Sequence, residues 1–127
     1  MGQEKVKILL VEDDPFLLSM YATKFELEGF EVISADDGQK GLSLARENKP
    51  DIILLDILMP KMNGFEVLRE LKANEQTRDI PVIFLTNLNQ KEEVERALEL
   101  GAVDYLIKAH FMPSEVVAKI KEVIEGM

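Results

Sequence analysis

Residues 51–64 read DIILLDILMPKMNG, an apolar run that ends on an acid and leads into a turn. The part from Asp51 to Asp56 is almost wholly apolar inside, as expected of a central strand that is covered on both faces. Residues 59–64 then form a turn-rich loop, and apolar residues recur after it at helical spacing. A strand of this kind belongs to a parallel sheet flanked by helices, so the stretch predicts an α/β fold.

The same alternation of strand and helix continues in both directions along the chain. Apolar runs predict strands at 6–11, 31–35, 51–56, 82–86 and 104–108. Apolar spacing and end signals predict helices at 15–29, 38–48 and 91–100, one that contains Phe65 and Leu68, and a last one from Pro113. Five strands that alternate with five helices through short loops require right-handed crossovers and a doubly wound parallel sheet.

The composition indicates one globular domain. The chain has 127 residues, of which 46% are hydrophobic and 31% charged, and this length suits about one domain of roughly 100 to 200 residues. Its formal charge of −9 repels nucleic acids and anionic membrane surfaces. There is no cysteine, and Met1–Lys7 carries no apolar export signal. We therefore expect a cytoplasmic protein without direct nucleic acid binding or membrane insertion.

Polar residues follow four of the predicted strands at the point where each strand ends. Glu12, Asp13 and Asp14 follow the first strand and Asp56 the third, while Thr86 and Lys108 end the fourth and fifth. Because the carboxyl ends of parallel strands lie along one edge of the sheet, these side chains would converge into a small, strongly acidic pocket. Such a pocket has the composition of a Mg²⁺-dependent site that accepts a phosphoryl group.

The crowded carboxylates need a cation, because they repel one another and raise each other's pKa. Mg²⁺ takes one or two carboxylates and keeps several waters, which suits Asp13 and Asp56 with Glu12 reaching the ion through water. Asp56 would then be the nucleophile, as carboxylates are in aspartyl-phosphate chemistry. The Lys108 ammonium and the Thr86 hydroxyl can each take one phosphoryl oxygen.

Each of these residues also has an ordinary structural interpretation. Asp14 before Pro15 is expected to cap a helix. Thr86 could bond to backbone at its strand end, and Lys108 could be a solvated strand end. The acceptor site rests on the whole set, because chance seldom places these residue types at the same edge of consecutive strands.

Four segments resemble the receiver domain of two-component response regulators, in the order of that family. They are VEDDP at 11–15, DILMPKMNG at 56–64, the strand that ends in Thr86, and DYLIK at 104–108. The resemblance implies a flavodoxin-like (βα)5 fold with strand order 2-1-3-4-5. It implies that Asp56 takes the phosphoryl group from a histidine kinase or a histidine phosphotransfer protein. It also implies Mg²⁺, which Mn²⁺ can replace, on Asp13, Asp56 and the backbone carbonyl of Leu58, with Glu12 assisting.

The resemblance further implies a switch that a downstream effector protein reads. Thr86 moves toward the phosphoryl group, and Tyr105 matches an aromatic that turns inward behind it, although a half-buried strand tyrosine with a solvated hydroxyl is also compatible with its position. Switching would repack the face formed by the fourth helix, fifth strand and fifth helix. The phosphoryl lifetime depends in the family on the positions of Leu58 and Leu88, and two apolar side chains there predict slow self-dephosphorylation.

Two local features add further expectations. Ala109 follows Lys108 where most family members have a proline with a cis bond, so we expect a trans peptide or a rearranged loop, and no role for the lone His110. Leu17 and Met20 lie on the side of the first helix opposite Leu18 and Phe25, which we expect to face solvent. In the family, phosphodonor proteins dock beside this helix, which makes Leu17 and Met20 candidate anchors.

These observations favour a phosphorylation-switched signalling protein over an enzyme. We expect residues 1–127 to form a single receiver domain without an output domain, similar to stand-alone chemotaxis regulators, and a domain cut from a longer regulator would look the same. A haloacid-dehalogenase-like phosphatase needs an acid at position 58, which is Leu58. FMN binding is disfavoured because the acids after the first strand would repel its phosphate. A phosphorylation-independent interaction module of the same fold remains the alternative.

Overall fold

The computed structural model describes residues 5–126, and the first four residues and the last of the expected domain 1–127 lie outside the described part. Residues 1–4 of the Met1–Lys7 segment, whose sequence has no apolar export signal, therefore lie outside the described residues. The elements are β1 (Lys7–Val11), α1 (Pro15–Leu27), β2 (Glu31–Ala35), α2 (Gly38–Asn48), β3 (Ile52–Leu55), α3 (Gly64–Ala73), β4 (Val82–Thr86), α4 (Lys91–Glu99), β5 (Asp104–Ile107), a 3₁₀ turn η1 (Lys108–His110) and α5 (Pro113–Glu125).

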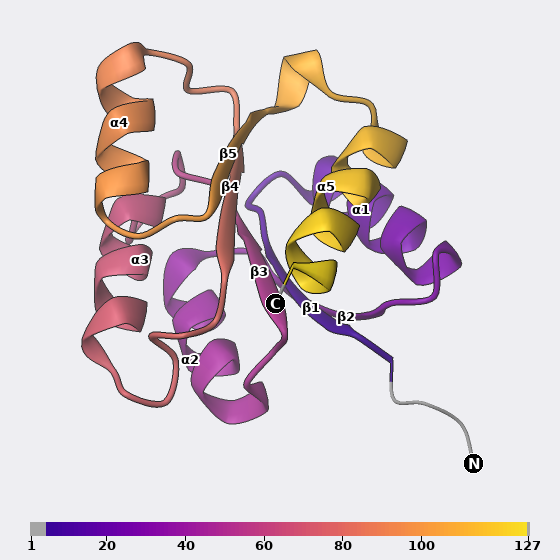
Figure 1. Cartoon of the computed structure of the whole chain (residues 1–127), viewed down its shortest axis with the longest axis horizontal. Coiled ribbons are helices and arrows are strands. Elements are labelled where there is room, and N and C mark those ends of the chain that lie inside the picture. The colour runs from indigo at the N-terminus through magenta and orange to yellow at the C-terminus, as the bar shows by residue number, and fades with distance from the viewer. Residues whose placement is uncertain (1–4, 127) are drawn as a thin grey trace.

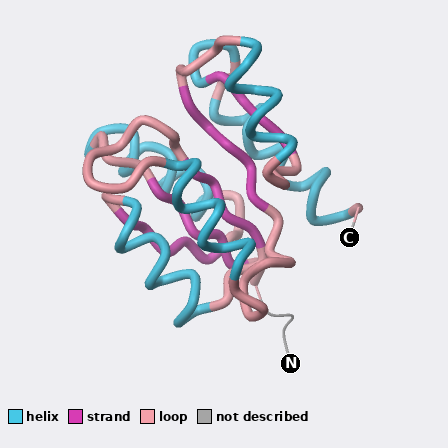
Figure 2. The backbone as a smooth tube through the Cα atoms, turned by 90° about the vertical axis from the view of Figure 1, so that its left-hand side faces the viewer, coloured by secondary structure: helices cyan, strands magenta, loops and turns pink. Residues whose placement is uncertain are grey.

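The five strands form one parallel sheet, as their alternation with helices predicts, and they lie in the order β2-β1-β3-β4-β5 that the family resemblance implies. Helices α2, α3 and α4 cover one face of the sheet, and α1 and α5 cover the other (Figure 1). Seen from the side of α2, α3 and α4, the strands run behind these helices (Figure 2). None of the helices in residues 5–126 is long and apolar enough to cross a bilayer.

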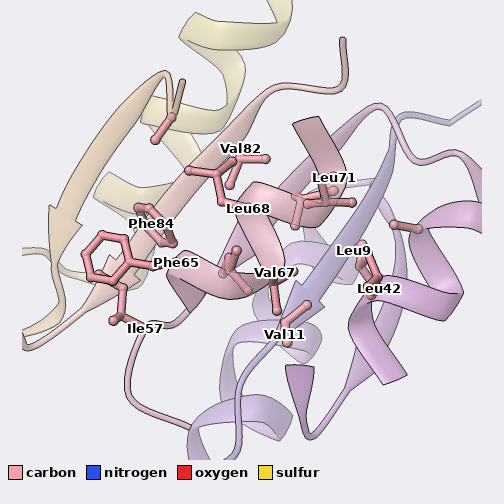
Figure 3. Close-up of a cluster of buried hydrophobic side chains, with 14 of the residues drawn as sticks. Leu9, Val11, Leu42, Ile57, Phe65, Val67, Leu68, Leu71, Val82 and Phe84 are labelled. Atoms are coloured by element: carbon pink, nitrogen blue, oxygen red, sulfur yellow. The ribbon is translucent and has the colours of Figure 1, made fainter. Parts of the chain in front are cut away.

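The central strand β3 is buried on both faces, which is why its sequence is continuously apolar. Ile53 and Leu55 belong to the core cluster beneath α2, α3 and α4, part of which Figure 3 shows. Ile52 and Leu54 belong to the second cluster, beneath α1 and α5. All four side chains are 0% exposed. The sheet is therefore a rigid support whose carboxyl edge carries the polar residues.

The helix beginnings next to that edge are fixed by side-chain caps. The Asp14 carboxylate accepts hydrogen bonds from the backbone N–H groups of Phe16 at 2.9 Å and Leu17 at 3.1 Å, so it caps α1 as expected. At the start of α3, the Asn63 and Glu66 side chains each bond the backbone N–H of the other. These caps hold the loops after β1 and β3 in place.

Candidate functional site

Three of the predicted site residues meet at the carboxyl edge of the sheet. Carboxylate oxygens of Glu12, Asp13 and Asp56 all lie within 4.8 Å of one another. Glu12 is 2% exposed and Asp56 5%, whereas Asp13 is exposed. The predicted convergence of residues from the ends of β1 and β3 is therefore confirmed, and it produces two buried acids beside an open one.

Lys108 joins this group from the end of β5. Its Nζ lies 2.8 Å from Asp56 Oδ2 and 2.5 Å from Glu12 Oε1, and only 10% of the side chain is exposed. The alternative interpretation of Lys108 as a solvated strand end is therefore wrong, and the ammonium lies at the Asp56 carboxylate, beside which the sequence interpretation places it. No pattern in the sequence indicates that Lys108 bridges Glu12 as well as Asp56.

Backbone N–H groups satisfy the remaining oxygens of the two buried acids. Asp56 Oδ1 accepts a hydrogen bond from the Ile57 N–H at 2.7 Å, and Glu12 Oε2 accepts one from the Asp14 N–H at 3.0 Å. Each carboxylate is thus held by one backbone donor and by the shared lysine. This arrangement fixes the direction in which Asp56 presents its oxygens.

Burial and the shared ion pairs shift the pKa values of Glu12 and Lys108. Desolvation raises the pKa of Glu12, against the opposing effects of Lys108 and the Asp14 N–H. Desolvation also acts to lower the pKa of Lys108, but the hydrogen bonds and charges of Asp56 and Glu12 together outweigh it and raise that pKa. Lys108 is therefore a permanent cation at neutral pH, and it pairs with both buried carboxylates.

The loop after Lys108 differs from a simple strand extension. Residues 5–126 contain no cis peptide bond, and Lys108–His110 form a 3₁₀ turn in place of the last predicted strand residue. The Ala109 N–H donates a hydrogen bond to Asn87 Oδ1 at 3.0 Å, which ties this turn to the loop after β4. A proline at position 109 would have no N–H for this bond. His110 is exposed in this turn, as expected of a solvated loop histidine.

Thr86 and Tyr105 both bond to Leu88, in the loop before α4. The Leu88 N–H donates to Thr86 Oγ1 at 3.3 Å, so the threonine hydroxyl makes the strand-end backbone bond that is its ordinary interpretation. The Tyr105 hydroxyl donates to the Leu88 carbonyl at 2.5 Å, and the side chain is half-buried, as expected. Burial, with smaller contributions from the charges of Glu93 and Asp56, raises the pKa of Tyr105 to about 12. Tyr105 is therefore a neutral hydrogen-bond donor at physiological pH.

The expectation that Leu17 and Met20 face solvent is wrong. Both side chains are half-buried and pack against the core cluster beneath α1 and α5. The reason is that α1 packs against α5 as well as the sheet, so apolar residues are needed on more than one of its sides. The exposed apolar residue at this end of α1 is Phe16, which is 75% exposed.

The donor set of the pocket suits a hard divalent cation. Carboxylate oxygens are the ligands that Mg²⁺ prefers, and here the acids outnumber the lysine that balances them. Leu58, whose backbone carbonyl the resemblance adds to this set, follows β3 in the loop before α3, and its side chain is 59% exposed. The negative charge of the pocket can therefore balance an added cation, and the pocket presents Asp56 to an incoming group.

Comparisons with known proteins agree with this geometry. Residues 8–121 match the family described as "Response regulator receiver domain". The chain is 38% identical over 118 residues to the DNA-binding dual master transcriptional regulator RpaA of Synechocystis sp., an alignment that covers 93% of the chain and 48% of RpaA. It is 40% identical over 118 residues to the phosphate regulon transcriptional regulatory protein PhoB of Escherichia coli, covering 93% of the chain and 51% of PhoB.

A solved structure shows the same fold over nearly its whole length. The chemotaxis protein CheY4 of Vibrio cholerae superposes with a TM-score of 0.89 at 28% identity, covering 94% of this chain and 99% of CheY4. The chain spans about half the length of the curated relatives that it matches, and the matched part is their receiver region. It therefore belongs to the family of receiver domains of two-component response regulators.

Proposed function

We propose that Asp56 accepts a phosphoryl group from a phosphohistidine donor. Asp56 Oδ1 is fixed by the Ile57 N–H and Oδ2 lies 2.8 Å from the Lys108 ammonium, at the carboxyl edge of a receiver sheet. In the transfer, a carboxylate oxygen bonds to phosphorus while the bond between phosphorus and the donor imidazole breaks. The observation that carries this proposal is the buried Asp56 carboxylate paired with a buried cation.

Mg²⁺ is the cofactor that we propose for this transfer, and Mn²⁺ can replace it. Asp13 and Asp56 would hold the ion together with the backbone carbonyl of Leu58, and Glu12 would assist through water. When bound, the ion neutralises negative charge on the carboxylates and on the transferring phosphoryl oxygens. Lys108 then holds one phosphoryl oxygen, and Thr86 holds another after its hydroxyl leaves the Leu88 N–H.

We propose that Thr86 and Tyr105 carry the signal away from Asp56. Support comes from their shared partner, because both side chains bond to the backbone of Leu88 just before α4. If the Thr86 hydroxyl moves toward a phosphoryl group, it loses its bond with the Leu88 N–H, while the bond from Tyr105 to the Leu88 carbonyl is kept. The loop before α4 would then reposition, and with it the face formed by α4, β5 and α5.

Slow loss of the phosphoryl group is the behaviour that we propose for this chain. Neither Leu58 nor Leu88 has a side chain that can orient an attacking water. We expect Leu88→Asn to lose the phosphoryl group about 10-fold faster or more, since an amide there can hydrogen-bond to water. Decay of the phosphorylated mass after removal of the donor measures this, with Leu88→Met as the matched control. Equal decay in the Asn and Met variants would contradict the proposal.

The proposed partners are a histidine kinase or histidine phosphotransfer protein, which donates, and an effector protein, which reads the switched face. We propose that residues 1–127 act in the cytoplasm as one receiver domain, through phosphotransfer and binding and not as an enzyme that turns over a substrate. Its longer relatives are named as DNA-binding or transcriptional regulators. The charge of −9 disfavours a direct contact of this domain with nucleic acid.

The donor is proposed to dock beside the first turns of α1, at Leu17 and Met20. Half-buried apolar side chains such as Leu17 and Met20 can still contribute to the edge of an interface, and the exposed Phe16 precedes Leu17 on the same helix. We expect Leu17→Asp to lower phosphotransfer from a histidine donor by about 10-fold or more, while phosphorylation by acetyl phosphate is retained. An equal loss with both donors would show a folding defect and contradict a docking role.

Intact mass after incubation with acetyl phosphate and Mg²⁺ tests the proposed function. We expect a gain of about 80 Da that needs Mg²⁺ and is absent in Asp56→Asn. No gain in a folded wild-type chain would favour the phosphorylation-independent interaction module instead.

A further inference from the structure

Helix α4 has few anchors in the core. Ala97 is its one fully buried residue in the described chain, and Gln90, which precedes its first turn, makes no side-chain cap bond. By contrast, α3 buries five residues and has a complete capping box. With so little buried surface, α4 depends for its position on a small number of individual side-chain contacts.

The most specific of these contacts is made by Arg96. Its guanidinium carbon lies 4.3 Å from the centroid of the Phe65 ring, which belongs to α3. Glu92, Glu93 and Glu99 stand three or four positions from Arg96 on the same helix, where ion pairs commonly form. Yet within residues 5–126 Arg96 makes no ion pair. The aromatic ring, and not a carboxylate, therefore determines where this cation lies.

Phe65 is the first ring of a row that leads to Tyr105. The Phe65 and Phe84 rings meet edge to face with centroids 5.6 Å apart, and Figure 3 shows them side by side. Phe84 and Tyr105 meet in the same way at 6.0 Å. The Tyr105 hydroxyl then bonds to the Leu88 carbonyl just before α4. One aromatic row thus touches α4 through Arg96 and the loop before α4 through Tyr105.

The same row borders the loop that carries Asp56. A methyl group added at Gly64 would meet the Phe84 ring at 3.0 Å and the Ile57 Cα at 2.8 Å, and it would also meet the Asp56 backbone carbonyl. Phe84 is 0% exposed, so it has no free space to move into. A change in the Asp56 loop therefore presses on the ring that lies between Phe65 and Tyr105.

We propose that Arg96 is a positioning residue that fixes α4 by stacking on Phe65. Through the row of Phe65, Phe84 and Tyr105, the position of α4 is then coupled to the Asp56 pocket. The coupling to the pocket rests on the proposed function, whereas the fixing of α4 does not. A guanidinium is suited to this role because it is planar, always charged and weakly hydrated. An ordinary helix-dipole role would need only a positive charge in the last turn.

Hydrogen exchange of the α4 amides tests the fixing of α4 in the absence of any ligand. In Arg96→Gln we expect these amides to exchange about two- to five-fold faster, with α5 amides unchanged. Phe65→Leu should accelerate α4 exchange at least as much, because it also removes packing against Phe84, and adding Arg96→Gln to it should cause little further change. Lys91→Gln is the control, because it removes a positive charge at the start of the same helix whose exposed pair with Glu95 is 3.8 Å long, and it should not accelerate α4 exchange.

Arg96→Lys separates stacking from charge. It keeps a cation in the last turn of α4 but has no planar group, so we expect α4 exchange between that of the wild type and that of Arg96→Gln. Wild-type exchange of α4 in Arg96→Gln would overturn the proposal. So would an equal acceleration in Lys91→Gln or in α5.

Beryllofluoride with Mg²⁺, a mimic of the phosphoryl group, tests the coupling. In the wild type we expect it to slow exchange in residues 56–64 and to change exchange in α4, and the α4 response should shrink in Arg96→Gln. An undiminished α4 response in that variant would overturn the coupling. No response in residues 56–64 of the wild type would instead count against the proposed function, and the ligand-free comparison would still decide the role of Arg96.

Discussion

Lys108→Met is expected to lower the free energy of unfolding at neutral pH by about 3 kcal/mol, measured by urea denaturation in EDTA. The change leaves Glu12 and Asp56 buried and without their shared cation. The variant should also accept phosphoryl groups about 100-fold more slowly, because no ammonium stabilises the transferring oxygen. Lys121→Met is the matched control, since this exposed lysine pairs only loosely with Glu28, and it should change stability by less than about 0.5 kcal/mol.

The stability deficit of Lys108→Met should depend on pH and on Mg²⁺. The folded pKa of Glu12 is raised above 4.5, so its ionisation costs stability as the pH rises from there through the folded pKa. Removing Lys108 raises that pKa further, so the deficit should shrink as the pH falls toward 4.5. Mg²⁺ should also reduce the deficit, because a bound ion offsets the same carboxylates. A deficit that is independent of both would contradict the assigned role of Lys108.

Gly64→Ala is expected to lower the free energy of unfolding by about 2 kcal/mol, although alanine is the better helix former by about 1 kcal/mol. The added Cβ would meet the Asp56 carbonyl, the Ile57 Cα at 2.8 Å and the Phe84 ring at 3.0 Å. Backbone atoms and a fully buried ring cannot move aside as a flexible side chain can, so overpacking outweighs the gain in helix propensity.

Gly126→Ala is the control for this substitution, and the same denaturation experiment measures it. Its Cβ would meet only carbonyl oxygens of α5, the nearer at 3.3 Å, so we expect a change within about 0.5 kcal/mol. Gly64→Ala should also slow phosphoryl acceptance, because relief of the clash shifts the loop that carries Asp56. A free energy of unfolding equal to that of the wild type in Gly64→Ala would contradict the prediction that the close packing around Gly64 excludes a Cβ.

The fold could be predicted because its main signals are local. The buried run 52–55 marks the central strand, and the residues that follow each strand mark the edge where the pocket forms. The strand order is implied by the resemblance to receiver domains, and the meeting of Glu12 with Asp56 follows from the edge that the carboxyl ends of parallel strands share.

The errors concern contacts that depend on three-dimensional packing. The sequence of α1 is apolar on several sides, so its periodicity could not tell which side faces solvent, and Leu17 and Met20 were assigned to the wrong one. The bridge from Lys108 to both Glu12 and Asp56 depends on how the 3₁₀ turn after β5 places the lysine.

Other contacts involve residues that carry no motif. The Asn87 side chain accepts from the Ala109 N–H across two loops, which no local pattern indicates. Arg96 lies among glutamates in the sequence, where an ion pair is the natural expectation, yet it stacks on Phe65 from another helix. Such contacts join distant segments, and only the packed structure brings them together.

Chemical mapping of the phosphorylated residue tests the central claim most directly. Borohydride reduces an acyl phosphate to an alcohol, so a phosphorylated aspartate becomes homoserine, which peptide mass spectrometry locates in the sequence. After treatment with acetyl phosphate and Mg²⁺, we predict homoserine at position 56 and at no other acid. Homoserine at position 13 in place of 56, or none in a folded and Mg²⁺-loaded chain, would contradict the assignment of Asp56 as the phosphoacceptor.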